Sequence, residues 1–298
     1  MSQSTAPGVS IVIPARNEAW NLGSLLGEIR RILPSAELIV VDDGSTDETA
    51  NVAVGAGAKV IRHRYSMGNG AAIKTGARHA QGEILVFMDA DGQHKPADIP
   101  RLLEKIDEGY DMCVGARGRD SQASVPRMFG NAIYNRLASW MVGHRISDLT
   151  SGFRAVRAAK FREFLHLLPN GFSYPTTTTM AFYRAAFGVA FVPIQAQPRG
   201  GGSSHIRLLH DGGRFFLIIF KVGVLYSPLK LFTPLSAAFF AGGCWYYAYT
   251  YISLGRFTNM GVLLFLSAAL LFMLGLLSEQ IATLMYMRVH SSANGREP

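Results

Sequence analysis

Two long stretches without a charged residue, near the end of the sequence, constrain the fold most strongly. They run from Leu231 to Gly255 and from Phe257 to Ser278, and only Arg256 separates them. The second stretch has 22 residues, so as an α-helix it would be about 33 Å long, enough to cross a hydrocarbon core of about 30 Å. The alternative, two helices buried in a protein core, would need a large surrounding protein. The sequence therefore predicts two transmembrane helices, at about 231–254 and 258–284.

The basic residues around these stretches predict their orientation. The short connection carries only Arg256, whereas the opposite ends are flanked by Lys221, Lys230, Arg288 and Arg296. Because basic residues favour the cytoplasmic side, both ends of the chain are expected there. The first apolar run, Val9–Pro14, is too short for the core of a signal peptide and has no basic region before it. We expect an integral membrane protein whose large domain lies on the cytoplasmic face of a bacterial or archaeal plasma membrane, or of the endoplasmic reticulum in a eukaryote.

Composition agrees with a membrane protein that handles phosphates. The chain is 49% hydrophobic and 17% charged, with a formal net charge of +8, whereas about 25% charged residues is usual in soluble domains. A basic protein suits an anionic membrane surface, phosphorylated substrates or nucleic acid. No clustered basic and aromatic motif is present, so the lipid bilayer is an expected partner and nucleic acid is not. Cys113 and Cys244 lack metal-site spacing, and no disulfide is expected between them.

The first half of the chain alternates strand-like and helix-like segments. Such alternation predicts an α/β domain with a mainly parallel sheet and helices on both faces. Ser45 and Glu48 have the spacing of a capping box for the second helix. The predicted strands are 9–14, 37–43, 58–63, 83–89 and 110–117, and the predicted helices include 22–29, 69–80 and 96–108.

Polar side chains follow four of these strands, at the sheet edge where α/β domains bind ligands. The polar residues are Arg16, Asn17, Glu18, Asp42, Asp43, Asp89, Asp91 and Arg117, and Pro14 ends the first strand at the same edge. Each alone has an ordinary explanation, as a helix cap, turn former or solvated loop residue. Because acids, amides and arginines follow four strands at the same edge of the sheet, they indicate a ligand-binding site there.

Asp89 and Asp91 follow the apolar run Ile84–Met88 with one alanine between them. Residues at positions i and i+2 of an extended strand point the same way, so both carboxylates could face one Mg²⁺ or Mn²⁺ ion, which takes oxygen ligands and shares them with substrate phosphates. Gln93 could add an amide oxygen. A turn is the alternative explanation of Asp-Ala-Asp-Gly. The chain has no P-loop motif and no Gly-x-Gly-x-x-Gly after a strand, which disfavours P-loop phosphoryl transfer and dinucleotide redox chemistry.

Five sequence blocks, in this order, resemble family 2 glycosyltransferases. They are VIPARNE, VVDDGSTD, FMDADGQH, DLTSGFR and RGGGSSHIR. The chain is most similar to the polyprenyl-phosphate branch of that family, which includes dolichol-phosphate mannose synthases and bacterial polyprenyl-phosphate glucosyltransferases. The resemblance implies a GT-A fold (Rossmann-like, with a mainly parallel sheet). It also implies a metal-dependent, inverting transfer of one sugar, with glucose or mannose favoured, from a UDP- or GDP-hexose to a dolichyl or undecaprenyl phosphate.

The resemblance also implies roles for individual residues. The nucleotide sugar would contact Pro14, Ala15, Arg16, Glu18, Asp43 and Asp89. The metal would be held by Asp89, Asp91 and Gln93. Catalytic roles would fall to Asp91, Asp148, Arg117, Arg127 and Arg199, the three arginines facing phosphates. The acceptor would contact Ser151, Phe153, Arg154 and His205.

Two of these roles stay open. Asp148 is a candidate catalytic base or a positioning residue, because a lipid phosphate is already anionic and needs no strong base. The family usually has lysine at the position of His205, and histidine is largely neutral near pH 7, which puts a fixed positive charge there in question.

The sequence thus predicts a GT-A domain at 1–205, juxtamembrane amphipathic helices at 206–228, two transmembrane helices within 229–290 and a cytosolic tail at 291–298. The amphipathic segment is indicated by Arg207, Arg214 and Lys221, which are spaced by seven and therefore share one helical face. Three alternatives remain: transfer to another lipid, extension of a polysaccharide, or a catalytically silent scaffold of a glycosylation complex. Homo-oligomerisation is left open.

Overall fold

The computed structural model describes residues 8–118, 125–171, 173–195, 220, 223–224, 226–256 and 258–294, with the backbone alone at 125–133, 254 and 287–294. The chain divides into two compact units, residues 1–206 and residues 207–298, and each is described by itself.

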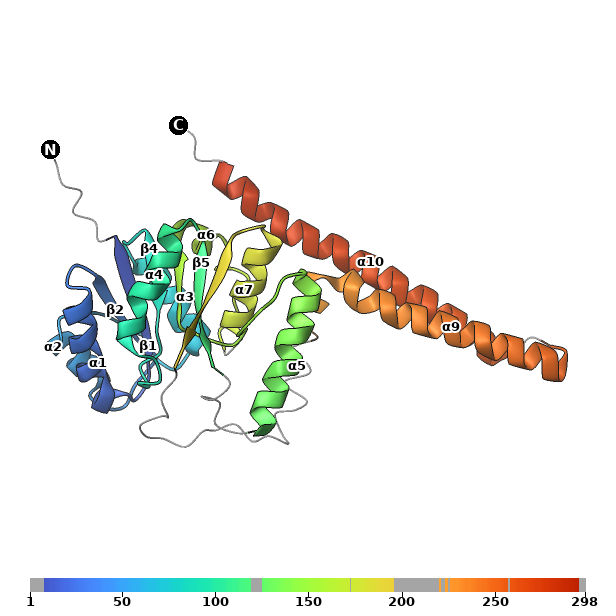
Figure 1. Ribbon diagram of the computed structural model, residues 1–298, viewed down its shortest axis with the longest axis horizontal. Helices are drawn as coiled ribbons and strands as arrows, with labels where there is room; N and C mark the ends of the chain where they lie inside the picture. Colours follow the sequence, from blue (N-terminus) through green and yellow to red (C-terminus); the bar gives the residue numbers. More distant parts are fainter. Residues whose placement is uncertain are drawn as a thin grey trace. The chain divides into compact units, whose positions relative to one another are not determined.

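A seven-stranded sheet forms the centre of the first unit (Figure 1). Its order is β3-β2-β1-β4-β6-β5-β7, and β6 runs antiparallel to both neighbours while the other pairs are parallel. The strands are β1 Val9–Ala15, β2 Glu37–Asp42, β3 Lys59–Arg62, β4 Ile84–Phe87, β5 Met112–Arg117, β6 Arg154–Arg157 and β7 Val189–Ile194. The first five confirm the predicted strands. The prediction missed β6, a four-residue strand with arginine at both ends, and β7, which contains a proline that argues against a strand in a sequence-based prediction.

Helices cover both faces of this sheet, as the strand–helix alternation predicts. Ile11 and Ile13 of β1 belong to a core cluster with residues of α1 (Ala19–Ile32) and α4 (Ile99–Asp107). Val12, between them, faces α3 (Asn69–His79): a Cβ on Gly76 would come within 2.2 Å of Val12 Cγ1. Because successive side chains of a strand point to opposite faces, β1 is buried on both sides.

The remaining helices of the first unit are short, apart from α5. They are α2 Thr49–Gly55, the 3₁₀ helix η1 Pro96–Asp98, α5 Val125–Val142, α6 Ala158–Glu163 and α7 Tyr174–Arg184. The predicted capping box is wrong: α2 begins only at Thr49, and the Ser45 hydroxyl instead accepts a hydrogen bond from the backbone N–H of Asn17 at 3.0 Å.

The second unit is a helical hairpin of α9 (Pro228–Leu254) and α10 (Asn259–Asn294). The Ser236 hydroxyl donates to the carbonyl of Ala268 at 2.8 Å, and the backbone N–H of Leu229 donates to Glu279 at 3.4 Å. Contacts nearer the start of α9 therefore involve positions nearer the end of α10, so the helices are antiparallel. Gly255 ends α9 in the left-handed conformation that favours glycine.

Only one helix of the described chain has the length and hydropathy of a membrane span. This is the segment Asn259–Tyr286 of α10, with a mean hydropathy of 2.6 over its best window, 17% of which is buried. In α9, Trp245 and four tyrosines between positions 246 and 251 lower the hydropathy. Helix α10 extends to Asn294, beyond the predicted end near 284. Arg207, Arg214 and Lys221 of the predicted amphipathic segment lie outside the described residues.

Candidate active site

The loops after β1 and β2 hold each other at the carboxyl edge of the sheet. Asn17, in the left-handed backbone region with φ of 56°, accepts a hydrogen bond from the Thr46 N–H at 2.8 Å. The backbone N–H of Glu18 donates to the Thr49 hydroxyl at 3.0 Å. Of the predicted nucleotide-binding residues here, Ala15 is buried, Pro14 and Glu18 are half-buried, and Arg16 is exposed.

Asp43 organises the chain after β3. Its buried carboxylate accepts hydrogen bonds from the His63 ring at 2.7 Å and the Ser66 hydroxyl at 2.8 Å. It also accepts from the backbone N–H groups of Met67, at 2.8 Å, and Gly68, at 2.9 Å. Burial alone would raise the pKa of Asp43, but these bonds outweigh it and lower the pKa below its ordinary value. Asp43, which the sequence predicts to contact the nucleotide, therefore also has a structural role: it fixes the segment that leads into α3.

We expect the free energy of unfolding to fall at acid pH because Asp43 becomes protonated. Since folding lowers its pKa, the carboxylate stabilises the fold above its ordinary pKa of 3.8, and this contribution is lost as the pH falls through the folded-state pKa. Asp43→Asn should lower the free energy of unfolding by about 1–3 kcal/mol near pH 7, and by less near pH 3. Thermal unfolding across that range, with the exposed Asp107→Asn as control, measures this. Equal destabilisation at both pH values would contradict it.

The candidate metal ligands lie directly after β4. Asp91 is buried and accepts a hydrogen bond from the backbone N–H of Gln93 at 3.1 Å, while Asp89 is half-buried. The turn between them is held by Asn21 of α1, whose amide donates to the carbonyl of Ala90 at 2.8 Å. Asp89 and Asp91 thus lie on a turn that is fixed to the first helix.

Gly152 leaves room for the carboxylate of Asp89. A Cβ at this glycine would lie 3.0 Å from Asp89 Oδ2 and 3.0 Å from the Tyr174 hydroxyl, which donates to the Gly152 carbonyl at 3.2 Å. Among the described residues, no group of three or more histidine, cysteine or acidic side chains could enclose a metal. Two carboxylates and an amide instead suit a Mg²⁺ or Mn²⁺ ion that completes its shell with water and substrate oxygens. The residues fit such an ion.

Adding a methyl group at Gly152 is expected to disturb this arrangement. Gly152→Ala would push against the Asp89 carboxylate and the Tyr174 hydroxyl, so we expect metal affinity and turnover to fall about 10–100-fold, as when groups that orient metal ligands are changed. Gly27→Ala is the matched control, because a Cβ there meets nothing within 4 Å. Mn²⁺ titration of both variants measures the effect; unchanged affinity in Gly152→Ala would contradict it.

Arg117 and Asp148 form a paired cluster beside these carboxylates. The Arg117 side chain donates to Asp148 from Nε at 2.8 Å and from Nη2 at 3.1 Å, and Nη2 also donates to the Thr150 hydroxyl at 2.6 Å. Burial works against both charges, but their mutual interaction raises the pKa of Arg117 and lowers the pKa of Asp148. The charges of Asp89 and Asp91 also act on Arg117. The structure thus brings these four predicted residues into one electrostatic site.

The carboxylate of Asp148 is fully used by the protein itself. Besides the two side-chain bonds from Arg117, it accepts from the Arg117 backbone N–H at 3.2 Å, the Thr150 N–H at 3.0 Å and the Thr150 hydroxyl at 3.1 Å. A carboxylate has about four lone-pair sites, and five donors point at this one. With a lowered pKa as well, Asp148 has the environment of a positioning residue more than that of a base.

Sequence reasoning missed two residues of this region. His94 is buried and stacks on Phe153, with ring centroids 5.1 Å apart, and burial lowers its pKa to about 4. Asn135 of α5 binds both neighbours of Asp148: its amide donates to the Ser147 carbonyl at 2.9 Å and accepts from the Leu149 N–H at 3.1 Å. The position of His94, directly after the predicted metal ligand Gln93, could have indicated that it belongs to the site. Nothing in the sequence around Asn135 indicates its role.

The predicted acceptor residues are mostly interior. Ser151, Phe153 and Arg154 are all buried. The Arg154 guanidinium donates to the carbonyls of Ser151 and Pro175, and burial lowers its pKa to about 10. Arg154 therefore stays charged near pH 7 and ties the segment before β6 to the start of α7. Its role in the structure is therefore to hold these two segments of the first unit together from inside.

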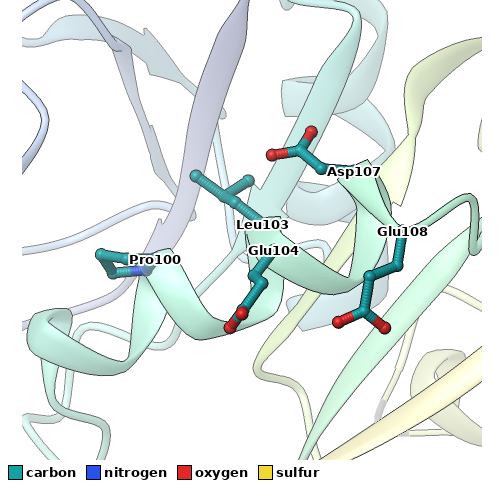
Figure 2. A pocket seen from close by; sticks show the side chains of 5 residues that line it. All are labelled: Pro100, Leu103, Glu104, Asp107 and Glu108. Atoms are coloured by element: carbon teal, nitrogen blue, oxygen red, sulfur yellow. The ribbon is translucent and has the colours of Figure 1, made fainter.

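Three predicted residues cannot be placed by their side chains. Arg127 belongs to α5, for which only the backbone is described at that position, while Arg199 and His205 lie outside the described residues. A separate hollow on α4, shown in Figure 2, is lined by Pro100, Leu103, Glu104, Asp107 and Glu108 and contains none of the predicted site residues.

Comparison with known proteins shows the family of the chain. Residues 10–165 match the model of glycosyl transferase family 2, which covers more than half of the chain. The chain belongs to glycosyltransferase family 2. Residues 227–284 of this family 2 enzyme match a second model, the GtrB C-terminal hairpin.

Curated relatives agree with this assignment. The chain is 30% identical over 244 residues to glycosyltransferase AglJ of Haloferax volcanii, covering 80% of each chain. It is 31% identical to a dolichyl-phosphate hexose transferase of the same organism, covering 67% of this chain and 88% of the relative. A similar match is the undecaprenyl-phosphate 4-deoxy-4-formamido-L-arabinose transferase of Klebsiella pneumoniae, 29% identical and covering 86% of each chain.

Among solved structures, the glucosyl-3-phosphoglycerate synthase of Mycobacterium tuberculosis, in complex with Mn²⁺, UDP-glucose and phosphoglyceric acid, has a TM-score of 0.59 at 22% identity. That match covers 73% of this chain and 79% of the synthase. It confirms the predicted GT-A fold of the first unit.

Proposed function

We propose that this glycosyltransferase transfers one sugar from a nucleotide sugar to a polyprenyl phosphate at a membrane. The observation that carries the proposal is one sheet edge on which the Asp89 and Asp91 carboxylates lie beside the Arg117–Asp148 pair. The relatives act on dolichyl or undecaprenyl phosphate by their names, and the chain shares the C-terminal hairpin of the GtrB model. Glucose and mannose, carried by UDP or GDP, are the favoured sugars.

The site would act mainly by positioning and charge stabilisation. Asp89, Asp91 and Gln93 would hold Mg²⁺ or Mn²⁺, which offsets the negative charge that develops on the leaving diphosphate. Pro14, Ala15, Arg16, Glu18 and Asp43 would bind the nucleotide. The acceptor phosphate oxygen is already anionic, so it can attack the anomeric carbon directly, with inversion, once it is oriented. Arg117, with Arg127 and Arg199, would orient phosphates, and Asp148 would fix Arg117.

We further propose that α9 and α10 both span the bilayer and that the first unit faces the cytoplasm. The uncharged stretch of α9 is as long as a span, and its Trp245 and tyrosines suit the membrane–water interface, where aromatic residues gather. The basic residues on the far side of the hairpin from Arg256 support this orientation.

Mass spectrometry of lipid products tests the function directly. Purified protein in detergent is given Mg²⁺ or Mn²⁺, a polyprenyl phosphate and a panel of nucleotide sugars. We expect one product mass, lipid phosphate plus one sugar, which disappears with EDTA. A ladder of masses would indicate polysaccharide extension. If no donor gives a product and no metal-dependent nucleotide-sugar binding is measured, a scaffold role replaces the proposal.

A further inference from the structure

The net charge of the chain is concentrated in one segment. Between Ser121 and His210 lie ten of the 29 lysines and arginines but only two of the 21 acidic residues, Asp148 and Glu163. Outside this segment the chain has 19 basic and 19 acidic residues, so the whole formal charge of +8 arises within it. Where basic residues of such a segment are exposed, they attract an oppositely charged partner.

Several of these basic residues already have protein partners. Arg154 is buried, Lys160 pairs with Asp111 at 2.7 Å, and Arg162 donates to the carbonyls of Ala77 and Ala80 at 3.0 and 2.6 Å. Arg136 and Arg145, by contrast, are exposed and form no ion pair with another described residue. Their positive charges are presented to the surroundings of the first unit.

A half-exposed tryptophan lies between these two arginines in the sequence. Helix α5 turns Tyr134, Ala138 and Met141 inward, each 4% exposed, and the Tyr134 hydroxyl donates to Thr176 of α7 at 3.1 Å. Trp140 is 50% exposed, and the helical spacing places it with Arg136 on the side opposite the inward residues. We call Arg136, Trp140 and Arg145, the last just beyond the end of the helix, the α5 face.

We propose that the α5 face rests on the anionic headgroups of the bilayer, so that the catalytic unit itself contacts the membrane. An exposed indole on the same side of α5 as Arg136, with the exposed Arg145 shortly after the helix, matches that surface: the ring is amphipathic and settles at the headgroup level, and the guanidinium groups bind lipid phosphates. The inference rests on the membrane attachment in the proposed function. It adds a second attachment, independent of the hairpin, which would fix the height of the active site above the lipid.

The three tryptophans of the chain provide the test. Trp20 is 60% exposed and lies on α1, Trp140 belongs to the α5 face and Trp245 to α9. Three full-length variants, each keeping one tryptophan and replacing the other two with phenylalanine, are reconstituted in vesicles of phosphatidylcholine and phosphatidylglycerol with acyl chains brominated near the headgroup. We expect loss of fluorescence for Trp140 and Trp245, relative to bromine-free vesicles, and none for Trp20.

The charge requirement is tested in the variant that keeps Trp140. Arg136→Gln with Arg145→Gln should abolish its quenching, whereas the exposed pair Arg31→Gln and Arg78→Gln removes the same net charge elsewhere and should not. Quenching of Trp245 alone would overturn the inference while leaving membrane attachment by the hairpin intact. If neither Trp140 nor Trp245 is quenched, both the inference and membrane attachment by the hairpin are overturned. Quenching of Trp140 that persists in pure phosphatidylcholine and in the double glutamine variant would overturn recognition of anionic lipid.

Discussion

Asp91→Ala is expected to reduce sugar transfer on the order of 10²–10³-fold, while leaving the fold intact. A metal ion at a diphosphate contributes several kcal/mol of charge stabilisation, and each 1.36 kcal/mol is a factor of about ten in rate. Asp91 is buried and its charge acts on Arg117 at the carboxyl edge of the sheet, so its loss would remove one of the two carboxylates proposed to hold the metal. The initial rate of product formation, at saturating donor and lipid, measures the effect.

Two further measurements separate loss of metal from loss of structure. Asp107→Ala removes an exposed carboxylate at the end of α4 and should keep full activity. Mn²⁺ affinity should fall in Asp91→Ala but not in Asp107→Ala, with thermal unfolding near that of the unmodified protein in both. Turnover by Asp91→Ala that matches the unmodified protein and resists EDTA would remove the metal from the proposed function.

The sequence predicts the first half of the fold well because four of its five strands, all except the edge strand β3, are buried along most of their length. Strands of this kind consist of continuous apolar residues with turn residues at each end, and Val9–Ala15 and Glu37–Asp42 follow that pattern. β6 does not: its sequence is Arg-Ala-Val-Arg, and it pairs with β4 and β5 in antiparallel register. The buried Arg154 side chain donates to Pro175 and Thr179 of α7, and no local sequence pattern predicts these contacts.

The same distinction applies to the site. Residues that directly follow strands, such as Asp89 and Asp91, are placed by the sheet, so their proximity follows from the alternation of strands and helices. Asp148 follows no strand. It meets Arg117, 31 positions away, because Asn135 holds Ser147 and Leu149 on both sides of it. These hydrogen bonds depend on tertiary packing. The sequence could therefore suggest a role for Asp148 only through its resemblance to family 2 glycosyltransferases.

Breaking the Arg117–Asp148 pair from the arginine side is expected to be the most damaging change to stability in the site. Arg117→Met would leave the Asp148 carboxylate, which is 5% exposed, without its cation. Removing one partner of a buried ion pair costs about 3–5 kcal/mol, and the lower end applies here because the Arg117 side chain is 26% exposed. Thermal unfolding measures the loss. In the double variant Arg117→Met with Asp148→Asn, no charge is left unpaired, so part of the lost stability should return; a purely additive loss would contradict the pairing.

Asp148→Asn then distinguishes a positioning residue from a base. Loss of a general base lowers kcat about 10²–10⁴-fold, whatever the concentration of lipid. We expect a different result, because the five hydrogen bonds from Arg117 and Thr150 leave the carboxylate no free lone pair with which to take a proton. The amide introduced by Asp148→Asn would hold Arg117 less firmly, so KM for the polyprenyl phosphate should rise while kcat at saturating lipid stays within about tenfold of the unmodified enzyme. A collapse of kcat at saturating lipid in a folded variant, together with loss of an acid limb in the pH profile, would instead identify Asp148 as the base.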